Sequence, residues 1–429
     1  MKPSVEARSL TLRNLSAPAT LVSGFDHGAP DPQTGLVRLD LAIRNGKLAI
    51  ADTAEPGQDA GGRIILPGFV DAHVHLDKAF SVYRTGFATE GLGSAVALSM
   101  ADAGQRTEDD IARRMQRALA AAERNNTVAM RTHLDTFDAP LSSPAWAAFR
   151  AIRTEWKDRI RLQAVALMAL FRVEGEDFDT RCRQLAEIGG VLGAFIAPGA
   201  TSKPRLERLL AAADAHGLDL DLHVDETLAA DADGLRLLAD IALQRGHKGR
   251  ITAGHCCALS AMEDNSRLID RVAEAGISVI ALPLTNGFLQ DRRAGRTPRQ
   301  RGIAPVHELD AAGIATCFAS DNVRDAFYPY GDFDMVEVLR QAHLLAHLEN
   351  APAHWAPSVH WRAAEIMGLA DCGWIRPGDD ADCAIFEARD WADLFASSGM
   401  RRTVLRKGRP LSGGLFDIAM QESGWRASA

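Results

Sequence analysis

The sequence predicts an α/β protein in which a (β/α)8 barrel of the TIM type is joined to a small β-sandwich domain. From about residue 64 to 370, eight short apolar segments alternate with amphipathic segments of helical period. Such alternation indicates a parallel sheet, and eight strands are the number that closes into a barrel. The alternative is an open, doubly wound sheet, but no G-x-G-x-x-G follows an early strand, which disfavours it.

The two ends of the chain are predicted to form one small β-domain, made of residues 1–63 and 371–429, and residues 64–370 form the barrel. Asn45-Gly46 joins two alternating runs, which is a strong signal for a β-hairpin. The strand-like runs in these ends lie at 19–23, 37–43, 47–50, 378–386 and 402–408.

Within the barrel, the predicted strands are 64–75, 127–133, 161–167, 191–196, 218–223, 250–255, 277–282 and 314–321. The predicted helices are 107–125, 204–215, 232–245, 260–276, 305–312, 332–349 and 357–368. Thr107 is the predicted N-cap of the first of these helices, because acidic residues fill the turn that follows it.

Composition restricts the class of protein and its partners. The chain has 429 residues, a formal net charge of −8 and no long run of like charge, so neither nucleic acid nor a membrane is expected as a partner. No apolar run is long enough to span a bilayer, and the first residues lack the apolar core of a secretion signal. The six cysteines are scattered without a C-x-x-C spacing, which indicates reduced thiols in a cytoplasmic protein.

The strongest local signal is His-x-His at the end of the first predicted barrel strand, formed by His73 and His75. Side chains on a strand alternate between faces, so both rings point to the same side and can bind one metal ion. On a helix the two rings would point about 200° apart. The motif alone is also compatible with two ordinary histidines beside a turn, so the prediction of a metal site depends on what the other strands carry.

Those strands also end in polar residues, and together the residues at strand ends are His73, His75, His133, His223, His255 and Asp321. The C-terminal ends of the strands of a parallel barrel share one face, where active sites are built. Three histidines and one carboxylate, with room for a water, suit zinc or ferrous iron. We therefore predict one divalent metal ion, zinc or iron, bound by His73, His75, His223 and Asp321, which lowers the pKa of a bound water.

Three further side chains near these ends each have two interpretations. Glu226, just after the fifth strand, is placed to act as a general acid/base, or else it is a solvated residue at a helix start. His255 is placed to stabilise an oxyanion, or else it is a structural histidine that faces Cys256 or Cys257. His133 either helps to bind the substrate or supports a metal ligand from behind.

The segment 321–331 follows the eighth strand and is rich in aromatic residues. Such a loop on the active face is suited to form the floor of a pocket for a flat ligand, and otherwise it merely caps the barrel. Its predicted contributors to substrate binding are Asn322, Arg324, Asp325 and Phe327.

These motifs resemble the amidohydrolase superfamily over essentially the whole chain. Pro-Gly-Phe-Val-Asp-Ala-His-Val-His at 67–75 is similar to its first-strand motif, and Gly-Asp-Asp-Ala-Asp-Cys-Ala-Ile-Phe at 378–386 to its C-terminal β-domain motif. The nearest branch resembles cytosine deaminase and N-isopropylammelide isopropylaminohydrolase. The matching segments of that branch lie at 73–80, 131–135, 223–226, 283–286, 289–290, 301–303 and 320–325.

The resemblance implies a mononuclear enzyme that uses iron or zinc to release ammonia or an amine from an azine ring by hydrolysis. It implies that Glu226 transfers protons, that His255 stabilises the oxyanion or hydroxide, and that Asp321 binds metal and accepts a proton. Asn286, in the match at 283–286, is expected to bind substrate. The resemblance also implies a homo-oligomer.

Two departures separate the chain from both members of that branch. Cytosine deaminases carry a glutamine where Ala169 stands here, and an aspartate where Asn322 stands. The aminohydrolase lacks the glutamate of its fifth-strand motif, whereas Glu226 is present. The predicted substrate is therefore a small aminated N-heterocycle related to cytosine, and we expect the apolar Met168, Leu170 and Phe171 to favour a larger or more apolar substituent.

Three alternatives to this deaminase remain. One is an N-alkylaminotriazine aminohydrolase. Another is a cyclic amide hydrolase, whose two-metal form needs a lysine after the fourth strand, where residues 195–199 contain none. The third is a binding protein with a structural metal, but such a site closes its coordination and needs no proton-transfer residue like Glu226.

Overall fold

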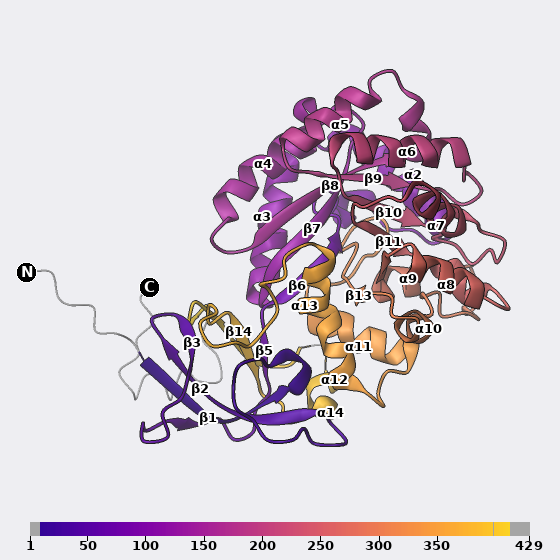
Figure 1. Cartoon of the computed structure of the whole chain (residues 1–429). Helices are drawn as coiled ribbons and strands as arrows, with labels where there is room; N and C mark the ends of the chain where they lie inside the picture. Colours follow the sequence, from indigo (N-terminus) through magenta and orange to yellow (C-terminus); the bar gives the residue numbers. More distant parts are fainter. Residues whose placement is uncertain (1–8, 398, 412–429) are drawn as a thin grey trace, which may run out of the picture.

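The main feature of the computed structural model, which describes residues 9–397 and 399–411, is an eight-stranded parallel barrel (Figure 1). In sheet order its strands are β6 (Phe69–Val74), β7 (Thr127–Asp135), β8 (Arg161–Ala169), β9 (Val191–Phe195), β10 (Leu220–Val224), β11 (Ile251–His255), β12 (Ile277–Ala281) and β13 (Thr316–Phe318). A parallel bridge between Val74 and Asp321 joins the first strand to the last. The barrel predicted from the alternating pattern is confirmed.

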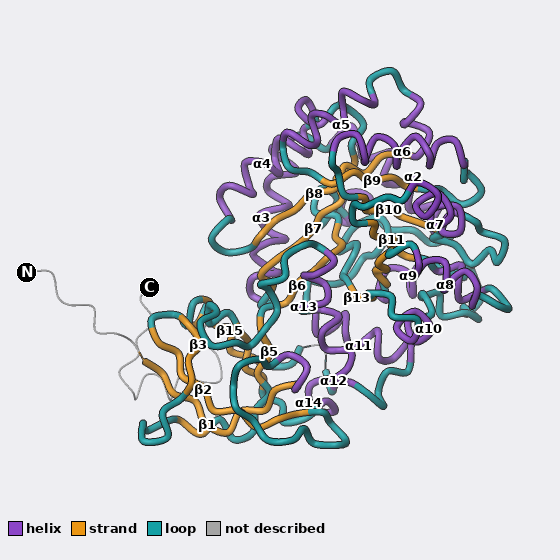
Figure 2. Tube along the Cα trace, viewed as in Figure 1, coloured by secondary structure: helices purple, strands orange, loops and turns teal. Residues whose placement is uncertain are grey.

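Helices cover the outside of these strands, as the purple and orange tubes of Figure 2 show. The longer ones are α2 (Leu92–Asp102), α3 (Glu108–Arg124), α4 (Pro144–Trp156), α5 (Phe178–Glu187), α6 (Lys203–His216), α7 (Gly234–Arg245), α8 (Ser266–Glu274) and α11 (Met335–Ala346). The shorter ones are α1 (Val82–Thr85), α9 (Pro283–Leu289), α10 (Val306–Ala311), α12 (Pro352–Trp355), α13 (Trp361–Ile366) and α14 (Trp391–Phe395). Within the described part of the chain, no helix is both long and apolar enough to cross a bilayer.

Two four-stranded sheets lie beside the barrel and draw on both ends of the chain (Figure 1). One consists of β3 (Lys47–Ile50), β2 (Leu36–Arg44), β1 (Ser9–Pro18) and β4 (Gln58–Asp59), and the other of β16 (Arg409–Pro410), β15 (Arg402–Arg406), β14 (Cys383–Phe386) and β5 (Ile65–Pro67). Leu12 and Leu41 of the first sheet and Ile385 and Leu405 of the second are buried in one apolar cluster. Residues 1–8, 398 and 412–429, which the predicted β-domain includes, lie outside the described residues.

Three predicted elements differ from the structure. The strand at 64–75 is interrupted at Gly68, and β5 pairs with β14 of the small sheet instead of joining the barrel. A Cβ at Gly68 would lie 2.3 Å from a methyl carbon of Val128, so any residue other than glycine would clash where the chain passes from the small sheet to the barrel. The strand at 19–23 is a single 3-10 turn, Ala19–Leu21, and the preceding strand Ser9–Pro18 was not predicted.

The predicted helix at 260–276 begins late, because a turn at Asp264 precedes it. The Asp264 carboxylate accepts hydrogen bonds from the Ser266 N–H, at 3.0 Å, and from the Ser266 hydroxyl, at 2.7 Å, and α8 starts at Ser266. Side chains of Asp compete for backbone donors in this way, which favours turns and helix starts over helix interiors.

The junction of the first and last barrel strands is held by a buried carboxylate. Asp71, which is fully buried, accepts a hydrogen bond from the Ser320 hydroxyl at 2.5 Å and one from the Ser320 N–H at 3.0 Å. Next to it, the Asp321 N–H donates to the His73 carbonyl at 2.9 Å. These contacts fix the two strands that carry His73 and Asp321 relative to each other.

We expect Asp71→Ala to lower the free energy of unfolding by about 2 kcal/mol, because it leaves the Ser320 N–H buried without an acceptor. Ser320→Ala is the matched control: it keeps the N–H contact, loses only the hydroxyl, and should cost about 1 kcal/mol. Urea unfolding followed by circular dichroism measures both values. Equal unfolding midpoints for Asp71→Ala and the native protein would show that this junction does not hold the barrel together.

Candidate active site

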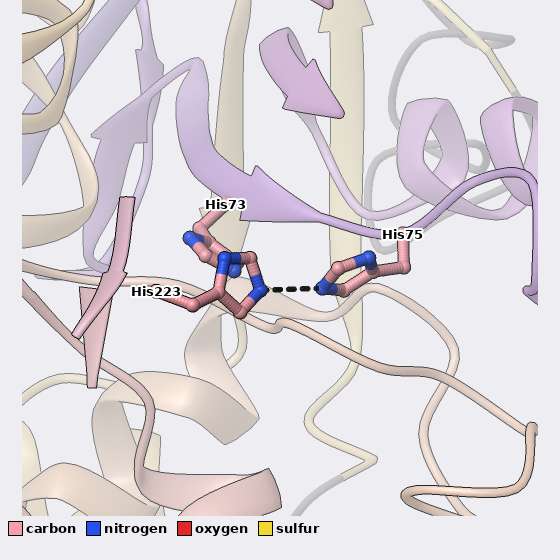
Figure 3. Close-up of side chains that lie close together, drawn as sticks. All are labelled: His73, His75 and His223. Carbon is pink, nitrogen blue, oxygen red and sulfur yellow. Dashed lines mark hydrogen bonds between the residues drawn. The ribbon is translucent and has the colours of Figure 1, made fainter. Parts of the chain in front are cut away.

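Three histidines gather at the C-terminal ends of β6 and β10, in the interior of the barrel (Figure 3). One ring nitrogen from each of His73, His75 and His223 lies within 4.8 Å of the others, and all three side chains are buried. His75 Nε2 and His223 Nε2 are 3.3 Å apart and point toward each other. The strand spacing of His73 and His75 therefore places both rings on the side that faces His223, as alternation requires.

Asp321 completes this cluster from just beyond β13. Its Oδ1 lies 3.2 Å from His75 Nε2 and 3.6 Å from His73 Nε2. Burial alone would raise the pKa of Asp321, but the adjacent rings of His75 and His255 bring it below its ordinary value. Burial lowers the pKa of His73 and of His223 well below the ordinary range, so both are neutral and keep a lone pair.

Several polar atoms in this cluster are buried without a hydrogen-bond partner among the described residues. They include both ring nitrogens of His73, Nδ1 of His75 and His223, and both carboxylate oxygens of Asp321. Buried polar groups are nearly always paired, and deprotonated histidine and carboxylate ligands are what a divalent metal requires. The residues therefore fit the predicted metal ion.

A second group of potential ligands, His73, His133 and Asp221, lies behind the first. Arg131 Nη1 already contacts Asp221 Oδ2 at 2.9 Å, and both side chains are buried. A guanidinium held this close opposes a second cation, so we expect a single metal. His133 Nε2 lies 3.5 Å from Asp221 Oδ1 and the ring stacks 3.9 Å from that of His73, so His133 supports His73.

Asp221 and Arg131 were not among the predicted site residues, although their spacing from the histidines indicates their place. Asp221 precedes His223 by two residues, and Arg131 precedes His133 by two. The alternation that paired His73 with His75 therefore also places each of these residues on the same face as its histidine.

Glu226 and His255 lie next to the cluster, with Glu226 Oε1 3.5 Å from His255 Nδ1. Glu226 is 5% exposed and starts no helix, since α7 begins at Gly234, so it is not a solvated helix-start residue. Burial, reinforced by the charge of Asp321, raises the pKa of Glu226 well above its ordinary value, which favours the protonated carboxyl group. Burial lowers the pKa of His255 to about 4, so this ring is neutral.

Asn286, on α9, fixes the orientation of His255. Its Nδ2 lies 3.0 Å from His255 Nδ1, and with the amide as donor the ring hydrogen of His255 resides on Nε2. Asn286 is fully buried and does not line the cavity, so the structure places it against His255, behind the cavity wall.

The cluster forms the inner end of a cavity of about 340 Å³. Of the predicted substrate-binding residues, Ala169, Asn322 and Phe327 line it, whereas His133, Asn286, Arg324 and Asp325 do not. The Arg324 Nε donates instead to the Gly331 carbonyl at 2.9 Å. The apolar lining residues are Leu92, Val96, Met100, Phe137, Leu167, Met168, Ala169, Phe171, Phe195 and Phe327.

The cavity wall also contains residues for which the sequence gave no expectation. Leu92, Val96 and Met100 come from α2, which was not predicted, and Phe195 ends β9. Leu170, which was predicted to shape the pocket, is buried and does not line the cavity. Met168 and Phe171 do line it.

Such a site, at the C-terminal ends of the strands of a parallel barrel, is that of a barrel metalloenzyme. The chain matches the model of the amidohydrolase family over residues 86–411. It is 38% identical to pterin deaminase of Rhizobium rhizogenes over 430 residues, which covers 97% of each protein. The chain therefore belongs to the amidohydrolase family.

Two other proteins show the same likeness at lower identity. N-isopropylammelide isopropyl amidohydrolase of a Pseudomonas species is 26% identical over 84% of this chain and 89% of its own length. The crystal structure of 5-methylcytosine deaminase from Klebsiella pneumoniae, at 24% identity, superposes with a TM-score of 0.79 over 94% of this chain and 98% of that chain. The superposition agrees with the barrel fold.

We expect the protein to contain one equivalent of zinc or iron per chain. His223→Ala removes one ligand nitrogen and should lower the metal content several-fold, because three histidines and Asp321 share the ion. His216→Ala, a histidine on α6 outside the cluster, is the control and should keep the full content. Inductively coupled plasma mass spectrometry of the purified proteins measures this, and two equivalents per native chain would contradict a single site.

Proposed function

We propose that the protein is a metal-dependent hydrolytic deaminase of an aminated N-heterocycle. The observation that carries the proposal is the position of Glu226: a buried carboxyl group that lines the cavity beside His255 and the histidine–aspartate cluster, and whose pKa is raised by that burial. An enzyme that expels an amine needs such an acid, because the amine leaves after it gains a proton. Membership of the amidohydrolase family and the relationship to a pterin deaminase support the same reaction.

Each residue of the site then has a definite task. His73, His75, His223 and Asp321 would hold one zinc or iron ion, which when bound lowers the pKa of water and so supplies hydroxide at neutral pH. Asp321, with a low pKa, accepts the proton that the attacking water releases. Glu226 donates its carboxyl proton to the departing amine, so water and the aminated ring give the oxo ring and ammonia.

His255 stabilises the oxygen that attacks the ring. Its Nε2 carries the hydrogen, because Asn286 faces Nδ1, and Nε2 has no partner among the described residues. A neutral imidazole fixed in this way donates a hydrogen bond to negative charge that develops on oxygen, without taking up a proton itself.

For the substrate, we propose a fused, bicyclic amino-oxo ring such as a pterin in preference to cytosine. The relative with 38% identity is a pterin deaminase. In addition, Ala169 stands where cytosine deaminases place a glutamine, and the outer wall of the cavity is apolar. A volume of about 340 Å³ lies within the range of small-ligand sites, which run from about 300 to 1,000 Å³.

A second candidate is release of an alkylamine from an aminotriazine. Its support is the 26% identity to N-isopropylammelide isopropyl amidohydrolase and the apolar mouth formed by Met100, Phe137 and Phe171. Cyclic amide hydrolysis with two metals has less support, because Arg131 opposes a second cation and residues 195–199, where β9 ends, contain no lysine.

We further propose a cytoplasmic homo-oligomer. All six cysteines are buried free thiols, which agrees with a reducing compartment. Tyr83 and Leu344 are large apolar side chains exposed by 76% and 62%, and a contact with a second copy would cover such side chains.

The proposed reaction is tested by measuring ammonia release from pterin, cytosine, 5-methylcytosine and an N-alkylaminotriazine, with zinc-loaded and iron-loaded protein. We expect pterin to be deaminated with the highest kcat/KM and cytosine at least tenfold less efficiently, since a cavity without the glutamine leaves polar edges of a small ring unpaired. Alkylamine release without ammonia would favour the second candidate. Ammonia from cytosine alone would contradict the bicyclic substrate.

Glu226→Gln should lower kcat by about 10²–10⁴-fold, because the amide keeps the shape of the side chain but cannot transfer a proton. Its metal content should equal that of the native protein, since Glu226 is not a proposed ligand. Glu263→Gln, an exposed glutamate, is the matched control. A native kcat in Glu226→Gln would remove the general acid from the proposed mechanism.

A further inference from the structure

We propose that Lys78 binds the carbonyl oxygen of the substrate ring, and that this contact selects oxo-substituted heterocycles. The inference rests on the proposed deaminase function and names one determinant of its specificity. Lys78 lines the cavity near the metal cluster and is only 4% exposed. It lies three residues after His75, in the chain that leaves β6.

The ammonium group of Lys78 has donors to spare. Its Nζ makes one hydrogen bond, to Asp135 Oδ1 at 2.6 Å, and lies 3.7 Å from Asp77 Oδ1, beyond hydrogen-bond distance. An ammonium has three N–H donors and no acceptor. Buried donors are nearly always paired, so an acceptor on a bound ring completes the coordination of Lys78.

The position of Lys78 is fixed by a network that converges from three segments. Asp135, at the end of β7, accepts from Lys78 on Oδ1 and from Arg106 Nη1 on Oδ2 at 2.7 Å. The Asp135 N–H donates to Asp77 Oδ2 at 2.9 Å. Arg106, between α2 and α3, donates in turn to the Ser99 hydroxyl at 2.6 Å. A cation held in this way loses little freedom when it binds a ligand.

The surroundings of the cavity make Lys78 the donor suited to a carbonyl oxygen. Among the described residues that line it, Lys78 and Arg172 are the basic side chains other than histidine. Arg172 is partly exposed and its Nη2 donates to the Phe137 carbonyl at 2.8 Å, at the mouth. Burial alone would lower the pKa of Lys78, but Asp135 and Asp77 raise it above its ordinary value, so the group stays charged.

A purely structural role, in which Lys78 only neutralises Asp135 and Asp77, predicts a different behaviour. Loss of a structural cation would impair all ligands equally by disturbing the cavity. Loss of a carbonyl-binding cation impairs ligands that carry the oxygen and spares those that lack it. The ratio of kcat/KM for a substrate with the oxygen to kcat/KM for one without it therefore separates the two roles, independently of any general loss of activity.

The test uses the full-length, metal-loaded protein and two variants, Lys78→Met and the double variant K78M/D135N, which also replaces the carboxylate whose Oδ1 loses its partner. The substrates are pterin and 2-aminopteridine, which lacks the ring oxygen. In Lys78→Met we expect kcat/KM for pterin to fall by about 10- to 100-fold, as for the loss of a charged hydrogen bond, and the preference over 2-aminopteridine to fall by the same factor. Lys203→Met, an exposed lysine on α6, should leave the preference unchanged.

A binding measurement keeps the inference separate from the proposed reaction. Calorimetric titration with lumazine, the ring after deamination, reports on the carbonyl contact even where no turnover occurs, and Lys78→Met should raise its Kd by the same factor. Equal losses for both pteridines, or an unchanged Kd for lumazine, would overturn the role of Lys78. A third outcome separates the two proposals. If lumazine binds the native protein and binds Lys78→Met more weakly, but no ammonia is released in any assay, the Lys78 contact stands and the deaminase function is rejected. If Lys78→Met does not fold, K78M/D135N gives the same comparison with one negative charge fewer beside the missing ammonium group.

Discussion

The closure of the barrel between β6 and β13 is the constraint on which the site depends. His73 and Asp321 are separated by most of the sequence, and they meet because the Asp321 N–H donates to the His73 carbonyl at 2.9 Å. Asp71 and Ser320 join the same strands one step away from the metal cluster. Since these are the first and last strands of the barrel, the cluster of His73, His75, His223 and Asp321 forms only when the barrel is closed.

The second constraint is the burial of polar groups, which lowers the pKa of histidines and raises the pKa of a carboxyl group. Burial keeps His73 and His223 neutral and so available as ligands. The same burial raises the pKa of Glu226, which favours the protonated form that the proposed general acid needs. The same low-dielectric environment thus favours both neutral histidines and a protonated Glu226, since desolvation disfavours whichever form of a group is charged.

The backbone at the strand ends is also unusual. Asp225, His255 and Asp321 have φ of 49°, 71° and 60°, a left-handed conformation that side chains with a Cβ seldom adopt. Each lies where a barrel strand ends on the face of the cluster. Strained backbone is tolerated where the surrounding structure fixes it, and here it turns the chain so that Glu226 and Asp321 reach the cavity.

Local patterns in the sequence were sufficient for the barrel and for the convergence of His73, His75, His223 and Asp321. Strand alternation acts between residues two apart, so the shared face of His73 and His75 could be inferred from their spacing alone. The positions of His223, His255 and Asp321 followed from the rule that parallel strands end on one face. The same reasoning failed at 64–75, because the transfer of β5 to the small sheet depends on its pairing with β14, which is distant in the chain.

Tertiary structure alone decided the shape of the cavity and the orientation of its polar side chains. Lys78 and Asp135 are 57 residues apart in the chain, and no local pattern shows that they meet at 2.6 Å. Arg324 was expected to face the substrate but binds the Gly331 carbonyl, and Asn286 was expected there but faces His255. The physical reason is one of range: alternation and capping are set by near neighbours, whereas these contacts depend on how whole loops and α2 pack over the end of the barrel.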